Sequence, residues 1–423
     1  MVSKNKKRLE ERKRKVADRC EDRSIIEIPS QKRRIFGNDE ATLVIEGVDK
    51  ENGFCGEQAS AILPTREYVA QQLVIAIRAK QLVVLEGPIG CGKTFLASYA
   101  ARELNIPLKV MQMGDQVDSK SFFGSYHCSE VAGQFLWKPS SFSQWLSNSC
   151  LILLEDIDLA NADVVSTVVQ LASERSAVLP SGEVVPFHKD VRICVTISGK
   201  GKKSGILDGV PVRIELQQLT DDELRRLISK ASPRVAHLAK TLVSIFRTIE
   251  GAPPTANSRQ LTSSDLLRGC ARLNKLTDLS SNMAIFTELV DTWCLADPTE
   301  RSFGLCKKLA DHLLITADQV SFHLFLRQPT FSHDERFCTV GRCRLPSSPS
   351  LHGSQRHRLG HTRDVLQLME RLAVCVQNRE PVLLVGETGV GKTSVVQFLA
   401  SAVNVTLKVV NLSPYSDADE LIS

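Results

Sequence analysis

A glycine-rich stretch early in the chain has the residue types and spacing that bind phosphate groups. It reads Gly87-Pro88-Ile89-Gly90-Cys91-Gly92-Lys93-Thr94 and matches the pattern G-x-x-x-x-G-K-[ST]. Glycines let backbone N–H groups converge on phosphate oxygens, because no Cβ atom intervenes. The pattern predicts that Lys93 contacts the β- and γ-phosphates and that the hydroxyl of Thr94 binds Mg²⁺. We therefore predict that this stretch binds ATP together with Mg²⁺.

The same pattern occurs a second time, near the end of the chain. It reads Gly386-Glu387-Thr388-Gly389-Val390-Gly391-Lys392-Thr393, and the match extends without a gap from Leu82–Phe122 onto Pro381–Leu421. Repetition over such a distance indicates tandem modules. The second copy predicts a second nucleotide site, with Thr393 as its metal-binding residue. A domain of this type needs roughly 150 to 250 residues, so we expect a truncated second module, partly unfolded and open to protease after about Thr362.

Two carboxylates follow an apolar run downstream of the first loop. The run is Cys150-Leu151-Ile152-Leu153-Leu154-Glu155-Asp156-Ile157-Asp158, and its apolar part predicts a buried strand. Open α/β sheets bind their ligands at the carboxyl ends of their strands. In a phosphate-loop ATPase the first acid supports Mg²⁺ and the second polarises the attacking water. Glu155 is therefore a predicted metal-binding and catalytic residue, and Asp156 a predicted catalytic residue; the alternative is a core strand that ends in solvated acids.

The elements around these residues alternate between strand-like and helix-like patterns. A strand is predicted at Leu82–Leu85, directly before the first loop, and a helix at Thr94–Leu104, directly after it. The other predicted elements are helix Tyr68–Ala79, strand Leu108–Met113, strand Gln134–Trp137, helix Ser141–Ser147, helix Ala162–Glu174 and strand Val191–Thr196. This alternation predicts a phosphate-loop α/β fold, a parallel sheet with helices on both faces.

Beyond Leu216 the pattern becomes helical. Thr220-Asp221-Asp222-Glu223 has the form of a capping box at a helix start. Amphipathic helices are predicted at Val235–Ile249, Ser264–Leu273, Met283–Leu295 and Phe303–Leu314, and Thr362–Val376 predicts a helix that leads into the second loop. The predicted domains are a basic tail and linker at 1–61, an α/β core at 62–216, a helical lid at 217–329, a basic linker at 330–361 and the start of the second module at 362–423.

The net charge of +5 is concentrated at the N-terminus. Residues 1–34 hold 13 Lys and Arg against 6 Asp and Glu, and their basic clusters resemble a bipartite nuclear import signal. The alternative is a solvated or disordered tail. The chain shows no signal-peptide core and no apolar run long enough to span a membrane, so we expect no membrane partner. The twelve cysteines form no C-x-x-C pattern and are expected to be reduced and buried.

A zinc site is a weaker alternative for part of the predicted linker. Cys338, Cys343, His352 and His357 have the spacing C-x4-C-x8-H-x4-H. The central spacing is shorter than in the usual zinc finger, and the intervening residues are rich in Pro and Ser. We therefore favour a basic linker over a metal site.

Together these motifs resemble the AAA+ ATPases, and specifically their dynein-related/midasin branch. The resemblance covers about residues 62–423. The stretches that carry it are Leu85–Thr94, Gly114–Lys120 and Leu153–Asp158 in the first module, and Leu372–Val376 and Glu380–Gly389 in the second. It implies ATP hydrolysis with Mg²⁺, in a ring made with other AAA+ modules. It also implies removal of assembly factors from precursors of the large ribosomal subunit, in the nucleolus and nucleoplasm, without sequence-specific nucleic-acid binding.

The catalytic acids of the first module depart from the family pattern. They read Glu155-Asp156, where the family has Asp-Glu, so Asp156 takes the place of the catalytic glutamate and is one methylene shorter. Ser198 takes the place of the water-positioning asparagine after strand Val191–Thr196, and is a predicted catalytic residue. Misplacement of a catalytic group by a bond length slows catalysis severely.

The arginines of the family pattern are also missing from their expected places. No arginine lies between Ser204 and Val212, where the family often carries an arginine finger. Ser264 stands where the lid usually presents an arginine, although Arg268 is one turn away. These departures predict ATP binding with slow turnover.

Other classes of protein remain open at this point. Dynein-type motors also carry tandem AAA+ modules, although nothing here resembles a microtubule-binding stalk. A non-enzymatic, nucleotide-binding structural chain, or the product of an incomplete gene model, would carry the same phosphate loops.

Overall fold

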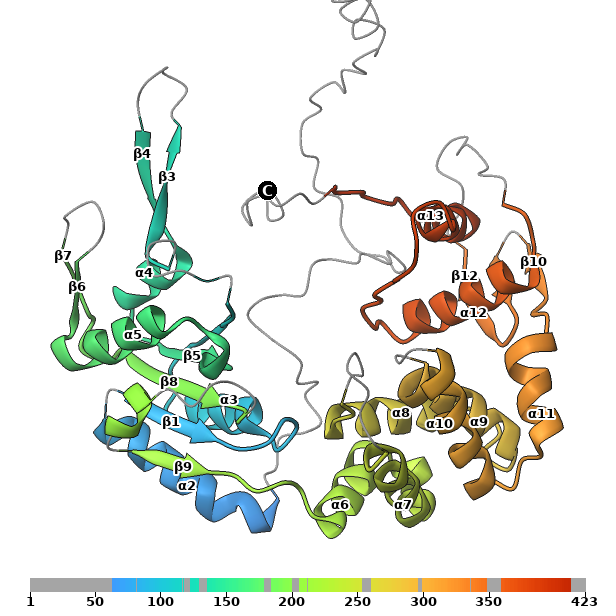
Figure 1. The fold of residues 1–423 in the computed structure, drawn as a ribbon, viewed down its shortest axis with the longest axis horizontal. Helices are drawn as coiled ribbons and strands as arrows, with labels where there is room; N and C mark the ends of the chain where they lie inside the picture. The colour runs from blue at the N-terminus through green and yellow to red at the C-terminus, as the bar shows by residue number, and fades with distance from the viewer. Residues whose placement is uncertain are drawn as a thin grey trace, which may run out of the picture. The chain divides into compact units, whose positions relative to one another are not determined.

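A five-stranded parallel sheet forms the centre of the N-terminal half of the structure (Figure 1). The computed structural model describes residues 63–411, except 81, 116, 118–121, 129–134, 179–183, 200–204, 211, 253–259, 296–298, 335 and 348–358. All described residues fall within one compact unit, Val44–Ser423. The basic clusters at 1–34 lie outside the described residues.

The first half of the chain alternates strands and helices, as the sequence predicted. Its strands are β1 (Leu82–Glu86), β2 (Leu108–Gln112), β3 (Gly124–Cys128), β4 (Phe135–Pro139), β5 (Leu151–Glu155), β6 (Ser176–Val178), β7 (Val184–Pro186), β8 (Arg192–Ile197) and β9 (Arg213–Glu215). Its helices are α2 (Pro64–Ala79), α3 (Lys93–Glu103), α4 (Ser141–Leu146) and α5 (Ala162–Glu174), with short 3₁₀ turns η1 (Ile157–Leu159) and η2 (Gly205–Gly209).

The sheet has the strand order β2-β5-β8-β1-β9, and every pair is parallel. Alternate residues of each strand enter two separate apolar clusters, because side chains of a strand point to opposite faces. Val83 and Leu85 of β1 pack with α2 and α3, whereas Val84 packs with α4 and α5. The pairs β3–β4 and β6–β7 form antiparallel hairpins outside this sheet. The predicted phosphate-loop α/β fold is confirmed.

The chain then becomes helical. The helices are α6 (Asp221–Ala231), η3 (Pro233–Leu238), α7 (Ala239–Glu250), α8 (Ser263–Lys275), α9 (Asn282–Leu289), η4 (Val290–Cys294), α10 (Thr299–His312), α11 (Ala317–Ser321) and η5 (Phe322–Leu326). They share one apolar cluster around the fully buried Trp293 and Phe246. The capping box at Thr220 and Glu223 is formed, with both reciprocal hydrogen bonds. None of the described helices is long and apolar enough to cross a bilayer.

Residues 331–346 differ from the predicted basic linker, because they form a small antiparallel sheet. Its strands are β10 (Phe331–His333), β11 (Phe337–Val340) and β12 (Cys343–Pro346). Cys338 and Cys343 are buried in an apolar cluster with the next helices, α12 (Arg363–Gln377) and α13 (Lys392–Ala402). Their thiols therefore serve packing. No group of metal-binding side chains occurs among the residues described, and His352 and His357 lie outside them.

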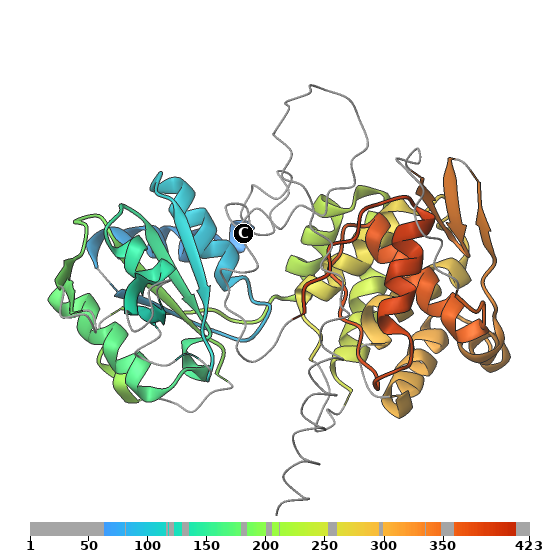
Figure 2. The ribbon, with the colours of Figure 1, turned by 90° about the horizontal axis from the view of Figure 1, so that it is seen from above.

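Helices α12 and α13 limit the partial unfolding expected after Thr362, because both are packed. Met369 and Ala373 on α12 are fully buried, and Val395 and Leu399 of α13 pack into the same cluster. Helices α12 and α13 are drawn in red-orange in Figure 2. An amphipathic helix is stabilised mainly by packing of its apolar face, and the small sheet β10–β12 supplies the surface for α12. The opening of the second module is folded in its helices.

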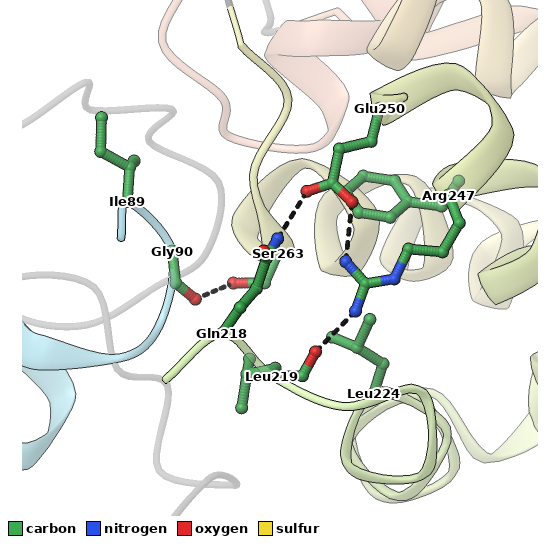
Figure 3. Close-up of a pocket in the computed structure, with 9 residues that line it drawn as sticks. Ile89, Gly90, Gln218, Leu219, Leu224, Arg247, Glu250 and Ser263 are labelled. Carbon is green, nitrogen blue, oxygen red and sulfur yellow. Dashed lines mark hydrogen bonds and ion pairs between the residues drawn. The ribbon is translucent and has the colours of Figure 1, made fainter. Parts of the chain in front are cut away.

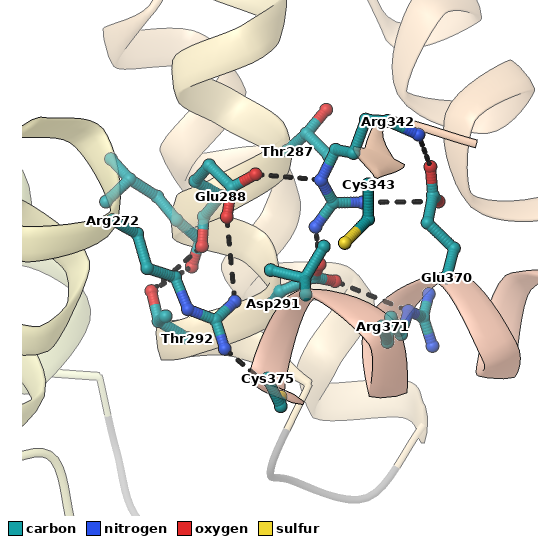
Figure 4. Close-up of polar contacts among 12 residues, drawn as sticks. Arg272, Thr287, Glu288, Asp291, Thr292, Arg342, Cys343, Glu370, Arg371 and Cys375 are labelled. Atoms are coloured by element: carbon teal, nitrogen blue, oxygen red, sulfur yellow. Dashed lines mark hydrogen bonds and ion pairs between the residues drawn. The ribbon is translucent and has the colours of Figure 1, made fainter. Parts of the chain in front are cut away.

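A buried network of charges also holds this region (Figure 4). Arg272 of α8 is paired with Glu288 of α9 and with Glu380, which lies just before the second loop. Arg342, in the turn between β11 and β12, contacts Glu288, Asp291 and Glu370. The acids Asp291 and Glu370 are also paired with Arg371 and Arg327. Burial alone lowers the pKa of Arg272, but the hydrogen bonds that its guanidinium donates to Glu380 outweigh burial and raise that pKa.

Candidate nucleotide-binding site

The first phosphate loop connects the carboxyl end of β1 with the start of α3. Gly90 and Gly92 have φ angles of 82° and 96°, in the left-handed region that favours glycine. The ammonium of Lys93 donates to the carbonyl oxygens of Gly87 at 2.6 Å and Pro88 at 3.1 Å. Its side chain is enclosed by the loop, and the residue is only 8% exposed. The loop therefore forms a closed turn around its own lysine.

Two glycines of the loop are required for different reasons. A Cβ atom on Gly87 would lie 2.5 Å from the carbonyl oxygen of Leu216, so a side chain has no room there. A Cβ atom on Gly92 would meet nothing within 4 Å, so glycine is required there for its left-handed φ angle and not for space. Gly92 is the N-cap residue of α3. The open side of the loop thus faces the unpaired N–H groups of a helix start, where anions bind.

The acids after β5 point to different neighbours. The hydroxyl of Thr94 donates to Oε1 of Glu155, so the two predicted metal-binding residues are in direct contact. Asp156 has a φ angle of 54°, in the left-handed region. Its Oδ2 accepts from Nε2 of Gln112 at 2.9 Å, and its N–H donates to Oγ1 of Thr196 at 2.9 Å. Glu155 therefore faces the loop, whereas the Asp156 carboxylate is held by the neighbouring strand β2.

Ser198, predicted to position the attacking water, is hydrogen-bonded to Asp158. Its hydroxyl donates to Oδ2 of Asp158 at 3.2 Å, and its N–H donates to Oδ1 of the same carboxylate at 3.3 Å. The N–H of Gly199 also donates to Asp158 at 3.1 Å. Ser198 thus ties the end of β8 to the turn after β5, and the structure gives no contact between it and Glu155 or Asp156.

A cavity lies beside the loop, between it and the helical lid (Figure 3). Ile89 and Gly90 line it on one side, and Gln218, Leu219, Arg247, Glu250 and Ser263 are among the residues on the other. The hydroxyl of Ser263, at the start of α8, donates to the carbonyl oxygen of Gly90 at 2.6 Å. The lid therefore contacts the phosphate loop directly. Ser263 makes this contact, whereas the sequence had pointed to Ser264 and Arg268 as the lid residues at the site. Nη1 of Arg268 lies 3.7 Å from Oδ1 of Asp265.

The second loop has the same local structure as the first. Gly389 and Gly391 have φ angles of 91° and 85°. The ammonium of Lys392 donates to the carbonyl oxygens of Gly386 and Glu387, each at 2.7 Å. Thr393 is exposed, and no carboxylate contacts it among the residues that the structure describes. The two matching strand segments, Leu383–Val385 and Leu407–Val410, are extended but belong to no sheet, which corrects the strands that the repeat suggested.

The residues of the first loop fit ATP with Mg²⁺. The glycines leave an open, donor-lined concavity, Lys93 can exchange its carbonyl partners for phosphate oxygens, and Thr94 and Glu155 offer the hard oxygen ligands that Mg²⁺ prefers. Magnesium usually keeps several waters and takes few protein ligands, so two protein oxygens suffice. The second loop has the same glycines and lysine contacts for phosphate binding. Among the described residues, no carboxylate corresponding to Glu155 contacts it.

Several residues around the site carry no motif and were missed in the sequence. They are Gln112, Thr196, Arg247, Glu250 and Ser263. The contact of Asp158 with Ser198 was also missed. Gln112 ends β2 and Thr196 is the last residue but one of β8, both next to β5, so the rule that strand ends carry ligands could have found them. Arg247 and Glu250 lie on a lid helix, and only the folded chain brings them to the loop.

Two family models match the chain. A model described as "AAA domain (dynein-related subfamily)" matches residues 82–209, which include the first loop and the acids after β5. A model described as "P-loop containing dynein motor region" matches residues 357–423, which include the second loop. Both models therefore fall on the repeated phosphate-loop modules.

Two relatives match over most of the chain. Midasin of Dictyostelium discoideum is 25% identical over 438 residues, which cover 83% of this chain and 7% of that protein. Midasin of Giardia intestinalis is 25% identical over 386 residues, which cover 85% of this chain and 8% of that protein. The chain spans less than a tenth of the length of these relatives. The chain thus has the phosphate-loop fold of the AAA+ ATPases, and its two modules are similar to dynein-related AAA domains and to midasin.

Proposed function

We propose that the chain binds ATP with Mg²⁺ at its first phosphate loop and hydrolyses it slowly. The observation that carries the proposal is the contact between Thr94 and Glu155 at the mouth of the loop that encloses Lys93. Thr94 and Glu155 come from α3 and β5 and meet only in the folded sheet, and Lys93 precedes Thr94 in the chain. Together they provide a cation for the phosphates and two oxygens for a metal ion.

Each residue would have a separate task in binding. The backbone N–H groups of the loop and the start of α3 would hold phosphate oxygens, and Lys93 would neutralise their charge. A bound Mg²⁺ would neutralise the charge that develops on the phosphates, with Thr94 and Glu155 holding it.

Slow turnover follows from the position of Asp156. It stands where a general base would act on water, but Gln112 donates to its carboxylate and its side chain is short. A group held 1 Å from its working position can lose about a hundredfold in rate. Ser198 is engaged with Asp158 and not with a water-binding position next to Glu155. We therefore propose that the first site holds ATP for longer than an active ATPase site would.

The binding proposal can be tested by calorimetric titration of ATP with Mg²⁺. Lys93→Ala should weaken binding by at least about tenfold, because a charge-assisted contact to phosphate is lost. Lys392→Ala removes the equivalent lysine of the second loop and should have a smaller effect, since no carboxylate of the described residues contacts that loop. Lys240→Ala, an exposed lysine on α7, is the matched control and should bind as the unaltered chain does.

An affinity of Lys93→Ala equal to that of the control would overturn the proposal. A larger loss in Lys392→Ala than in Lys93→Ala would reverse the order of the two sites. Circular dichroism of each variant separates loss of binding from loss of fold.

We further propose a role in remodelling precursors of the large ribosomal subunit in the nucleus. The similarity to two midasins supports it, together with the basic clusters of residues 1–34. The partners would be assembly factors on these particles and other AAA+ modules of the same ring. A dynein-like motor is the second candidate, because the model that matches the second loop is named for the dynein motor; relatives that cover most of the chain are midasins, which favours the first.

Fractionation tests this role. A tagged chain should sediment with large-subunit precursors from nuclear extract and should leave the nucleus when Arg12, Lys13, Arg14 and Lys15 are replaced by Ala. Sedimentation away from these particles, with microtubules, would favour the motor.

A further inference from the structure

A second cavity lies at the amino end of β1, the end opposite to the phosphate loop. Its volume is about 180 Å³. It is bounded by the end of α2, the start of β1, helix α5 and the turn η2 (Figure 1). The lining residues are Lys80, Leu82, Val169, Ala172, Ser173, Gly209 and Val210. Strand β1 has five residues, so the cavity and the phosphate loop are roughly 16 Å apart along the strand.

The inner wall of this cavity is apolar. Leu82, Ala172 and Val210 are 7%, 8% and 9% exposed and belong to one apolar cluster. Val169 of α5 packs against the same cluster. An apolar cavity of about 150 Å³ has room for a benzene molecule. The cavity at β1 is therefore large enough for one ring or one branched chain, which would cover these side chains from water.

The rim of the cavity is polar. Its exposed residues are Lys80, Ser173 and Gly209. Lys80 is the C-cap residue of α2, and its ammonium has no carboxylate partner among the described residues. The hydroxyl of Ser173 donates to the carbonyl oxygen of Val169 at 3.0 Å, and it can rotate to donate to a ligand instead. A cation and a hydroxyl at the mouth of an apolar cavity suit a carboxylate.

The same rim favours a small free ligand over a side chain of a protein partner. Protein interfaces surround an anchor pocket with further apolar and aromatic contacts. The three exposed residues at this rim carry no large apolar side chain. A small molecule needs only an apolar cavity and a few polar groups that fix its orientation.

We propose that this cavity binds a small apolar carboxylate. Its ring or branched chain packs against Leu82, Val169 and Val210, and its carboxylate contacts Lys80. A bound ligand joins the end of α2 to α5. No described residue lines both this cavity and the one beside the phosphate loop, so the proposal does not depend on nucleotide binding.

The experiment titrates phenylacetate into the full chain and follows the methyl signals of Leu82, Val169 and Val210 by NMR. Phenylacetamide has the same shape without the charge and is the matched ligand. Both ligands should shift these methyl signals in a saturable way. Phenylacetate should bind at least about threefold more tightly, because it also pairs with an ammonium at the surface.

Two substitutions at the end of α2 test the charge. Lys80→Gln should abolish the preference for phenylacetate and keep the affinity for phenylacetamide within about twofold. Arg78→Gln, at an exposed position two residues earlier, is the control and should keep the preference.

Two further substitutions fill the cavity, Gly209→Leu from η2 and Ala172→Leu from α5. Each should weaken the binding of both ligands at least about tenfold, because the added side chain takes the place of the ring. A Cβ atom on Gly209 meets no atom within 4 Å, so that variant introduces no clash at its Cβ. The remaining methyl signals report whether each variant is folded.

Three results would overturn the proposal. The first is a titration without saturable shifts at Leu82, Val169 and Val210. The second is unchanged binding in both folded cavity-filling variants, since the ligand would then lie elsewhere. The third is an unchanged preference for phenylacetate in Lys80→Gln. Lys93→Ala should leave every one of these titrations as it is, which distinguishes this cavity from the phosphate loop.

Discussion

The two phosphate loops have the same backbone and the same lysine contacts, yet different surroundings. In each loop the glycines at the fourth and sixth positions of the pattern are left-handed, and the lysine donates to two loop carbonyl groups at 2.6 to 3.1 Å. The first loop follows a strand buried between β8 and β9. The second follows an extended segment in which Leu383 is 87% exposed and Val385 is 85% exposed. Loop conformation is therefore a local property, determined by glycines and the start of a helix.

The two loops differ in whether a carboxylate from another strand contacts the loop threonine. In the first module β5 delivers Glu155 to Thr94. The strand order β2-β5-β8-β1-β9 places two strands between β1 and β2, so the second-copy segments that match β1 and β2 could not pair with one another. A phosphate cradle can form in about a dozen residues of local structure, whereas a metal-binding carboxylate requires the sheet.

The largest expected effect is on stability, in a pair of leucines related by the repeat. Leu85 is fully buried in β1, and its counterpart Leu384 is half-buried outside any sheet. Leu85→Ala should lower the free energy of unfolding by about 2–5 kcal/mol, and Leu384→Ala by less than about 1 kcal/mol. Urea denaturation measures both. Equal losses would show that the second segment is packed as tightly as the first.

The next effect concerns turnover at the first loop. Asp156→Glu restores the length of the family's catalytic acid and should raise the single-turnover rate of ATP hydrolysis by up to about a hundredfold. Lys392→Ala should not change this rate, because the second loop has no carboxylate among its described neighbours. Brisk hydrolysis by the unaltered chain would contradict our interpretation of Asp156. A rate that stays slow in Asp156→Glu would place the block at the missing arginine.

The smallest effect distinguishes the metal-binding threonines. Thr94→Ala should reduce the gain in ATP affinity that Mg²⁺ provides by about tenfold, because the hydroxyl beside Glu155 is lost. Thr393→Ala should leave that gain nearly unchanged. Titrations with and without Mg²⁺, using the unaltered chain as reference, measure the gain. A comparable reduction in both variants would mean that the two loops bind magnesium alike.

The fold of the first module was predictable because its signals are local. The run Cys150–Leu154 is apolar and short, so it predicted a buried strand, and the capping box at Thr220 marked the start of α6 correctly. Helix Ala162–Glu174 was predicted with its observed bounds, since its apolar residues have helical spacing. The contact of Thr94 with Glu155 followed from the rule that ligands gather at the carboxyl ends of strands.

Other features could not be read from the sequence, because they depend on distant partners. The Asp158 carboxylate lies near Ser198 only because β5 and β8 are neighbours. Residues 331–346 look like a linker in the sequence, because their strands are short. These strands pair with one another and are stabilised by packing against α12, which the sequence does not show. The packing of α12 and α13 was missed for the same reason. A helix with an apolar face was already present in the prediction, but the surface that buries it was not.

The buried charge network of Figure 4 also has an evolutionary consequence. It joins the arginines Arg272, Arg327, Arg342 and Arg371 to the acids Glu288, Asp291, Glu370 and Glu380. Loss of one partner from a buried pair costs about 3–5 kcal/mol, a large part of the about 5–15 kcal/mol that holds a typical domain together. Substitutions at paired positions of this network are therefore expected to be correlated. In a set of homologous sequences, a change at Arg272, which is 5% exposed, should be accompanied by a change at Glu288 or Glu380.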